Sequence, residues 1–484
     1  MSGYLRRLAT TGAAYTAASI FSKLIAVALL PLYTRYLTKA DYGAAEVMFA
    51  AVVSSSFAAL FWVSTAAALL ALPFAGPISE ALLKESAPDL ARISIGGLWV
   101  LTMFEFLLTL FRLEERARAY FVTTMLSVLA AIGLTVVLVV GRGEGAKGLL
   151  LGSYASGAVF VVGLIWVHRR RLSLWFDRSL LRRLLHFGLP TMPAELSLYL
   201  LNFVDRIIIV RTLGLPAAGL YSLAVKFAQG VNVLVRGFQL AWPPLAYSIR
   251  DDGEARKVYA TVVTWFVAAM AFVVAGMWLL SRWIVRALAA PQFFHAYEPI
   301  GLLSAAAALY ALYMVLVVIL GRTGRTGFNF PATGAALAAN IALNLALVPP
   351  LGIVGAGLAL VASYLVVLAL MYGFTQRLFP VPYEWGRLAR IVSVSTVLVA
   401  AGELLLPTAG FAGLVARTAF WLSYPAVLLA IGFFTKGERN WLARLRHPGE
   451  LAARLRSLRP VAAAVEGQVP ETYEVEQMDE DSRL

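Results

Sequence analysis

The chain has 484 residues, of which 60% are hydrophobic and 14% are charged, and its formal net charge is +14. Soluble domains average roughly 45–50% apolar and about 25% charged residues, so this composition excludes an ordinary soluble protein. There is no cysteine, which excludes disulfides and thiolate metal sites, and the four histidines are scattered singly, which argues against a metal centre. The basic residues lie in short loops, as the positive-inside rule predicts for a membrane protein, and do not indicate nucleic-acid binding.

Apolar runs long enough to cross a bilayer recur along most of the chain, and they predict an all-α, polytopic membrane protein with about 13 transmembrane helices. The first run follows Arg6 and Arg7, but it is too long for a cleavable signal peptide and lacks an Ala-x-Ala-like site. In chain order, the predicted spans cover residues 11–33, 44–75, 93–111, 119–140, 149–167, 188–212, 217–246, 258–280, 299–320, 331–348, 353–375, 391–407 and 412–434.

The linkers between these spans alternate in basicity. The intervening linkers carry roughly half as many Lys and Arg as the basic ones, so we expect the basic set and both termini to be cytoplasmic. The basic linkers are the N-terminus and residues 112–118, 168–186, 249–257, 321–326 and 376–390.

A sequence repeat divides the chain into two related halves. Arg35, Leu37 and Gly43 recur at the same internal offsets as Arg211, Leu213 and Gly219. Secondary transporters are built from such repeats, with the binding site at their interface. We therefore expect four parts, which are an N-terminal lobe at 1–187, a C-terminal lobe at 188–375, an additional helix pair at 376–434, and a tail at 435–484 that is basic, then acidic and disordered.

Residues 44–75 interrupt this regularity. The segment is too long for one ordinary span and too short for two. The distance from Gly43 to Gly145 is also shorter than the matching distance from Gly219 to Gly352, by about one span and a loop. With the flanks 34–43 and 73–92 expected on the outer side, the segment should form either a shallow helix pair or one overlong, bent helix. A single crossing would place the N-terminus outside.

Polar stripes mark three of the predicted helices. At about 100° per residue, Glu195, Tyr199, Asn202 and Arg206 share one stripe, with Asp205 beside it. The next helix places Lys226, Gln229, Asn232 and Arg236 on one face, and the first helix places Tyr15, Ser19 and Ser22 together with Lys23 at their edge. A charge at the bilayer centre costs on the order of 3 kcal/mol, so such residues normally face a cavity or a partner.

We predict that these stripes line a cationic, water-filled cavity that receives an anion. Asp205 and Arg206 could instead form a structural ion pair, and Glu105 and Glu403 are interpreted as near-interface residues. No linker is long enough for a catalytic domain and no Walker A pattern is present, so we expect no catalytic residue, no metal and no cofactor. The predicted cationic substrate-binding residues are Lys23, Arg206, Lys226 and Arg236, and the polar or counter-ion residues are Tyr15, Ser19, Glu195, Asn202, Asp205, Gln229 and Asn232.

Several motifs in a fixed order resemble those of a known family. They are Ser22-Lys23-Leu24, Pro31 to Leu37 and Asp41-Tyr42-Gly43; then Phe187-Gly188-Leu189-Pro190, Asp205-Arg206, Leu213-Gly214, Gly219-Leu220-Tyr221, Lys226 and Gln239 to Pro244; and finally Asn340, Asn344, Pro349, Gly352, Gly355 and Ala356. Over about residues 1–434 the chain resembles the bacterial polysaccharide flippases, for O-antigen and capsule, of the multidrug/oligosaccharidyl-lipid/polysaccharide exporter superfamily.

The resemblance implies two six-helix lobes in a V shape followed by two more helices. It also implies an activity, the movement of an undecaprenyl-pyrophosphate-linked oligosaccharide from the inner to the outer leaflet of the bacterial inner membrane. Lys and Arg would then offset the desolvation of the pyrophosphate. The implied partners are this lipid-linked substrate, membrane lipid and the glycan polymerase of the pathway. The short second helix region departs from the family pattern.

Other functions compete with this interpretation. A lipid II flippase of the same superfamily would differ mainly in substrate, whereas a multidrug exporter would favour acidic residues in the cavity. A glycan polymerase or ligase would need a large outer loop, which the spacing of the spans does not provide. A transport-impaired, truncated homologue is a further alternative because of the short segment 44–75.

Overall fold

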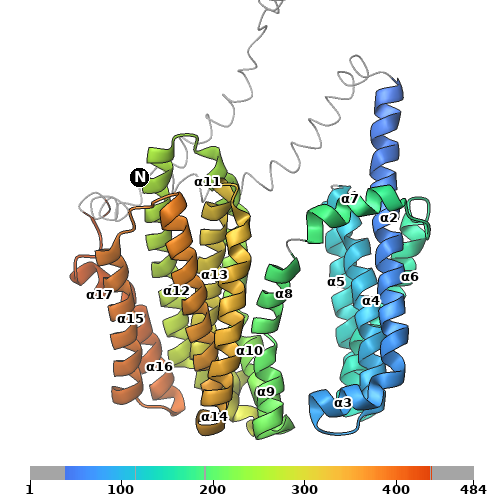
Figure 1. Cartoon of the computed structure of the whole chain (residues 1–484). Helices are drawn as coiled ribbons and strands as arrows, with labels where there is room; N and C mark the ends of the chain where they lie inside the picture. Colours follow the sequence, from blue (N-terminus) through green and yellow to red (C-terminus); the bar gives the residue numbers. More distant parts are fainter. Residues whose placement is uncertain (1–38, 115, 190–191, 436–437, 439–484) are drawn as a thin grey trace, which may run out of the picture.

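The computed structural model describes residues 39–114, 116–189, 192–435 and 438. Within these ranges the secondary structure is entirely helical, and nine helices are long and apolar enough to cross a membrane. The predicted all-α, polytopic membrane fold is therefore confirmed. Figure 1 shows the helices in two groups that stand side by side, one formed by the first part of the chain and one by the remainder.

The first group contains six α-helices and two short turns of other helix types. They are α2 (Lys39–Ala71), the 3₁₀ turn η1 (Leu72–Phe74), α3 (Ala75–Leu83), α4 (Pro88–Leu113), α5 (Ala117–Val136), the π turn η2 (Val137–Gly141), α6 (Gly145–His168) and α7 (Arg178–Gly188).

The second group contains the remaining helices. They are α8 (Met192–Leu201), α9 (Val204–Leu213), α10 (Leu215–Ala228), α11 (Val231–Ser248), α12 (Asp252–Leu288), η4 (Pro291–Tyr297), α13 (Ile300–Arg322), η5 (Thr326–Phe328), α14 (Asn329–Leu378), α15 (Trp385–Leu405), α16 (Gly410–Leu422) and α17 (Tyr424–Ala430).

The short segment forms one overlong helix, which was one of the two predicted outcomes. The 33 residues of α2 would extend roughly 50 Å, against a hydrocarbon core of about 30 Å. No Gly or Pro occurs between Gly43 and Pro73, so nothing in the sequence ends the helix before η1. The helix runs from the end that holds α7 to the end that holds α3 (Figure 1). Residues 39–43 thus lie opposite the 73–92 flank, and the prediction that both flanks share the outer side was wrong.

α14 is a helical hairpin, whose two arms share one label. Gly352 lies at φ 60° and ψ −143°, in a left-handed region that favours glycine, and it follows Pro349 and Pro350. A Cβ atom added to Gly355 would lie 2.2 Å from the carbonyl oxygen of Leu347, so the two arms approach closely at this turn. The arms correspond to the predicted spans 331–348 and 353–375.

Two of the predicted spans are broken near their middle. α8 ends at Leu201 and α9 begins at Val204, while α10 ends at Ala228 and α11 begins at Val231. The breaks fall at Asn202 and at Gln229-Gly230. In contrast, Pro243 and Pro244 remain inside α11. At both breaks the backbone tightens into i→i−3 bonds: the N–H groups of Phe203 and Gly230 donate to the carbonyl oxygens of Leu200 and Phe227.

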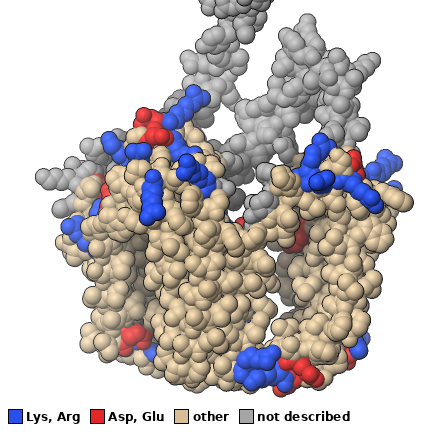
Figure 2. Space-filling view, viewed as in Figure 1, with Lys and Arg blue, Asp and Glu red and all other residues tan. Residues whose placement is uncertain are grey.

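The charged side chains lie mainly at the two ends of the molecule. Figure 2 shows Lys and Arg gathered at the end that holds α7, next to a broad band with few charges. There Glu114, at the end of α4, pairs with Arg171 at 2.6 Å and with Arg116 at 3.4 Å. This pattern matches a membrane protein whose α7 end is cytoplasmic, because cytoplasmic loops carry the excess of Lys and Arg.

α15 and α16 are joined to α12 by a cluster of ion pairs around the partly buried Glu403 carboxylate. Arg417 is fully buried and binds Glu403 at 2.7 Å, and Arg282 of α12 lies 3.2 Å from the same carboxylate. Glu403, which was predicted only as a near-interface residue, is therefore the structural counter-ion of Arg417 and Arg282.

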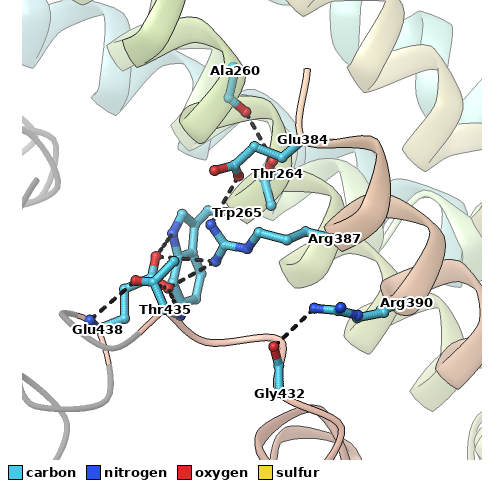
Figure 3. Close-up of polar contacts among 9 residues, drawn as sticks. All are labelled: Ala260, Thr264, Trp265, Glu384, Arg387, Arg390, Gly432, Thr435 and Glu438. Carbon is cyan, nitrogen blue, oxygen red and sulfur yellow. Dashed lines mark hydrogen bonds and ion pairs between the residues drawn. The ribbon is translucent and has the colours of Figure 1, made fainter. Parts of the chain in front are cut away.

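The start of the tail docks at the opposite end of α12 and α15. Arg387 binds Glu438 at 3.0 Å and Glu384 at 2.9 Å (Figure 3). Its guanidinium also lies over the Phe433 ring. Burial would raise the pKa of Glu438, but hydrogen bonds from Thr435 and the charge of Arg387 outweigh it and hold that pKa below its ordinary value.

Candidate functional site

A polar cavity of about 550 Å³ lies in the second group of helices, at the breaks between α8 and α9 and between α10 and α11. Figure 1 shows α8 and α9 on the side of this group that faces the first group. The remaining walls come from α13 and α14. The polar lining comprises Tyr199, Asn202, Asp205, Arg206, Gln229 and Asn232, and the aromatic lining adds Phe203, Tyr310 and Tyr364.

Asp205 and Arg206 make separate contacts in the first turn of α9. The Asp205 carboxylate is buried, and it accepts hydrogen bonds from the Tyr221 hydroxyl and from the backbone N–H of Arg206. The Arg206 guanidinium donates instead to the carbonyl oxygen of Asn202 at 2.9 Å. In the described part of the chain no ion pair joins the two side chains, so the predicted structural pair is not formed. Arg206 keeps several N–H donors free at the cavity.

Asn202 is fixed across the break by α14. Its side-chain amide donates to the Tyr364 hydroxyl at 2.9 Å and to the carbonyl oxygen of Leu198 at 2.8 Å. The oxygens of Asn202 and Tyr364 also lie 3.1 Å apart, and Tyr364 is almost fully buried. The contact ties the α8–α9 break, next to Arg206, to the second arm of the α14 hairpin.

Other polar groups of the cavity have no internal partner. Among the residues that the structure describes, the side-chain amides of Gln229 and Asn232 and the hydroxyls of Tyr199 and Tyr310 make no hydrogen bond. Amides and hydroxyls both donate and accept, so these groups can bind a ligand that presents hydroxyls or carbonyls. The cavity therefore combines one unpaired cation with several neutral hydrogen-bonding groups.

The other predicted site residues lie elsewhere. Lys226 and Arg236 are exposed and do not line the cavity, and Glu195 is exposed one turn before Tyr199. Of the predicted face of Lys226, Gln229, Asn232 and Arg236, only Gln229 and Asn232 line the cavity. The role of Lys226, Arg236 and Glu195 as cavity residues stays a prediction. Lys23, Tyr15 and Ser19 lie outside the described residues.

Tyr310 and Tyr364 were not predicted as site residues. Each stands in a strongly apolar span, on α13 and α14, without a polar stripe on its own helix. A tyrosine hydroxyl inside such a span usually finds a hydrogen-bond partner, and this weak signal could have drawn attention to both. Tyr364 meets its partner Asn202 on another helix, and Tyr310 makes no hydrogen bond among the described residues, so helical periodicity alone does not identify them.

The two groups of helices touch at the end opposite α7, where α3 meets α9. The Arg211 guanidinium donates to the carbonyl oxygen of Ala81, and the Lys84 ammonium donates to the carbonyl oxygen of Arg211. Both acceptors belong to the last turns of their helices, where backbone carbonyls lack helical partners. This reciprocal capping, which we call the α3–α9 clasp, closes the molecule at this end.

Comparison of the sequence with known proteins gives one family and two curated relatives. The model of a family described as "Polysaccharide biosynthesis protein" matches residues 48–298. The succinoglycan biosynthesis transport protein ExoT of Rhizobium meliloti (strain 1021) is 26% identical over 266 residues, which are 52% of this chain and 52% of ExoT. The amylovoran biosynthesis protein AmsL of Erwinia amylovora is 26% identical over 232 residues, 45% of this chain and 58% of AmsL. The chain spans about half the length of these relatives.

Solved structures show a related fold. The lipid II flippase MurJ, in an inward closed conformation, superimposes with a TM-score of 0.60 at 12% identity, over 88% of this chain and 91% of MurJ. A multidrug resistance MATE family transporter of the MOP superfamily, in an inward-facing conformation, gives a TM-score of 0.59 at 16% identity, over 71% of this chain and 82% of the transporter. At these identities the likeness concerns the fold alone.

Proposed function

Because the chain belongs to the family of polysaccharide biosynthesis proteins, we propose that it is a flippase for lipid-linked glycan precursors. Its substrate would be an undecaprenyl-pyrophosphate-linked oligosaccharide, moved from the inner to the outer leaflet of the bacterial inner membrane. The observation that carries the proposal is the polar cavity at the α8–α9 break, where the Arg206 guanidinium has no acidic partner among the described residues. Intramembrane charges of this kind typically mark substrate pathways.

The substrate's headgroup explains why such a cavity would be needed. Pyrophosphate and sugar hydroxyls lose strong hydration when they enter the hydrocarbon core, and an unpaired polar group there costs several kcal/mol. Arg206 can offer a bidentate, charge-assisted contact to a phosphate oxygen pair. Lys23, Lys226 and Arg236 are proposed as further cations on the path of the same headgroup. The lipid tail would stay in the bilayer, so the protein needs to shield only the headgroup.

Alternating access supplies the transport step. We propose that the lobes 1–187 and 188–375 rock against each other, as transporter repeats do, with the α3–α9 clasp holding the outer end closed in the present state. The α7 end, with its basic loops, would face the cytoplasm, where the substrate is assembled and where the C-terminal tail would lie. The single crossing of α2, together with the predicted span 11–33, would place the N-terminus on the outer side. Movement of a bound lipid across the membrane requires no covalent chemistry, so the proposal is a transporter and not an enzyme.

Complementation in cells tests the proposal. A strain that lacks its own flippase but makes the cognate glycan should regain surface polysaccharide when it carries this chain, and Arg206→Ala should reduce that polysaccharide at least tenfold at matched protein level. Arg206→Lys keeps the charge but loses bidentate geometry, and should reduce it less. Arg250→Ala, an exposed arginine outside the cavity, is the matched control and should leave export unchanged.

The outcomes separate the competing functions. Restored export that does not depend on Arg206 would contradict anion binding in this cavity. If the chain fails here but supports growth of cells depleted of their lipid II flippase, the substrate is lipid II. If it exports cationic drugs but no glycan, it is a multidrug exporter. Failure in all three assays, with folded protein in the membrane, would indicate a transport-impaired homologue.

A further inference from the structure

We propose that the cavity is a sugar subsite, which holds the sugar next to the pyrophosphate while Arg206 binds the phosphate itself. This inference rests on the proposed function, and it specifies which part of the substrate the second lobe would recognise. The cavity residues are mostly neutral: the amides of Gln229 and Asn232 and the hydroxyls of Tyr199 and Tyr310 stand beside one half-buried cation, Arg206, and the buried Asp205 carboxylate.

The hydrogen-bonding groups fit a sugar better than a second phosphate. A phosphate only accepts hydrogen bonds at its ionised oxygens, so its best partners are donors such as Lys and Arg. A sugar hydroxyl both donates and accepts, and a carboxamide offers both functions in one plane. Gln229 and Asn232 make no hydrogen bond among the described residues, although they line a polar cavity at membrane depth. Gln229 is exposed to the cavity and Asn232 is half-buried, so both amides are available to a ligand with hydroxyl groups.

Aromatic rings form the remaining walls. Tyr199 and Phe203 stack with ring centroids 5.9 Å apart and an interplanar angle of 16°, and Tyr199 is 64% exposed. On another wall Tyr310 and Tyr364 lie 5.8 Å apart at 57°. The faces of such rings carry partial negative charge and attract C–H groups, which one face of a pyranose ring presents. A wall of amides and a wall of rings together match the polar edge and the apolar face of a sugar.

The frame behind these groups is already ordered. Asn202 is held by Tyr364, and the buried Asp205 is held by Tyr221 and by the backbone of Arg206. These bonds occupy the groups that would otherwise compete for Arg206, so its guanidinium stays available at the rim. A site that is ordered before binding loses little conformational entropy when the ligand enters.

The cavity's size limits what it can recognise. Its volume of about 550 Å³ lies within the roughly 300–1,000 Å³ range of small-molecule sites. It accommodates a short part of the glycan next to the pyrophosphate, and the remaining sugars and the lipid must lie outside it. The subsite would therefore read the first sugar of the glycan and tolerate variation further along the chain.

Binding measurements on the full-length protein in nanodiscs test this division of the headgroup. The probes are undecaprenyl pyrophosphate without sugar and undecaprenyl pyrophosphate that carries a single glucose, galactose or N-acetylglucosamine, with affinity read by native mass spectrometry. At least one sugar-bearing lipid should bind about tenfold more tightly than the bare lipid, which corresponds to two or three added hydrogen bonds.

The variants separate sugar contacts from phosphate contacts. Gln229→Leu and Asn232→Leu each remove an amide at similar volume, and each should weaken the sugar-bearing lipid about five- to tenfold without changing the affinity for the bare lipid. Tyr310→Phe removes only a hydroxyl and should act in the same direction, so it serves if a leucine variant does not fold. Arg206→Gln should weaken both lipids. Gln239→Leu, on α11 but outside the cavity, is the matched control.

Each outcome has a defined meaning. If the bare lipid binds as tightly as every sugar-bearing lipid, the sugar subsite is wrong while the flippase proposal stands. If the Gln229 and Asn232 variants weaken the bare lipid as much as the sugar-bearing lipid, these amides bind phosphate or support the fold, and the inference is also wrong. If no lipid binds the wild-type protein, the proposed function fails together with the inference.

Discussion

The two lobes of this protein differ in how deeply their helices are packed. In the most apolar windows of α12, α13 and α14, 50% of the residues are buried, whereas the corresponding share in α5 and in the span Ala51–Leu83 is 11%. One extended cluster of buried residues runs from α8 to α14, while the first lobe has a smaller cluster around Phe57, Met103 and Leu107. The first lobe is also the one in which a single helix, α2, occupies the short region.

This difference in packing suits the two lobes to different roles. The second lobe can hold a polar cavity with unpaired amides because a large apolar core surrounds it. The first lobe, with fewer packed neighbours, supplies a wall and the outer contact through α3. The truncation thus falls on the lobe that does not line the polar cavity described above, which is compatible with retained transport.

The largest expected effect is an all-or-none labelling pattern that tests the single crossing of α2. The chain has no cysteine, so introduced thiols report without background. In intact cells Glu85→Cys should react with a membrane-impermeant maleimide, Lys39→Cys should react only after permeabilisation, and Leu60→Cys should react in neither state. Reaction of positions 39 and 85 from the same side would mean that 44–75 returns to its starting side.

A large loss of stability should follow from breaking the buried ion pair of the second group. Arg417→Leu leaves the Glu403 carboxylate with only the partly exposed Arg282, and should lower the free energy of unfolding by about 3–5 kcal/mol. Arg142→Leu, an exposed arginine of the first lobe, should change it by less than about 0.5 kcal/mol. Chemical denaturation in detergent measures both, and similar effects for the two would contradict the packing difference.

Within the first lobe, the contact between α5 and α6 should be more sensitive than its exposed surfaces. A Cβ atom at Gly152 would lie 2.2–2.7 Å from Thr135, including its backbone, whereas nothing lies within 4 Å of the same atom at Gly163. Gly152→Val should therefore destabilise the protein by about 1–3 kcal/mol through overpacking. Gly163→Val, on the same helix, should have little effect, and a thermal shift that is equal for both would show that α5 and α6 separate readily.

The α3–α9 clasp should shift the balance between conformations more than it changes stability. Lys84→Ala and Arg211→Ala each remove a hydrogen bond to a helix C-terminus, worth about 1 kcal/mol, and should raise the population of an outer-open state several-fold. Electron paramagnetic resonance between spin labels at positions 85 and 213 would then report longer distances in these variants than in the wild type. Lys147→Ala is the control, and unchanged distances in both clasp variants would show that the clasp does not hold the closed state.

The smallest effect concerns acid and the docked start of the tail. The pKa of Glu438 is lowered in the folded protein, so its contact with Arg387 stabilises the docked state above the ordinary carboxyl pKa, roughly 4.3. That contribution should be lost as the pH falls through the lowered folded pKa. The protection factors of amides near Thr435, which correct for the pH dependence of intrinsic exchange, should fall in acid in the wild type, whereas Glu438→Gln should show low protection at both pH values. Protection that falls on alkalinisation in the wild type would contradict the sign.

Much of the fold follows from local sequence, whereas the site does not. The spans are predictable because membrane crossing requires about 20 consecutive apolar residues, and α12 and α13 fall where the runs indicate. The polar stripe that contains Asn202 and Arg206 can also be read from the local sequence. The breaks at Asn202 and Gln229-Gly230 are not, because no proline marks them, and they decide which residues of each stripe reach the cavity.

Contacts between distant helices account for the other differences. Tyr364 is a cavity residue because Asn202, on another helix, meets it, and Arg211 joins the lobes because α3 ends beside α9. Periodicity places a side chain on a face of its helix but does not identify the helix opposite. The prediction for residues 44–75 left a hairpin and a long helix open for the same reason. The sequence repeat shows how many residues the first half lacks, but it does not show how the remaining residues fold.

Reconstituted transport tests the central claim most directly. Proteoliposomes that contain the full-length chain and a fluorescent undecaprenyl-pyrophosphate-linked oligosaccharide should expose the lipid to an external quencher faster than protein-free vesicles. Arg206→Ala should slow this exposure at least tenfold, and Arg250→Ala should not. Wild-type vesicles that expose the lipid no faster than protein-free vesicles, or equal rates for the wild type and Arg206→Ala, would contradict a flippase that works through the cavity of the second lobe.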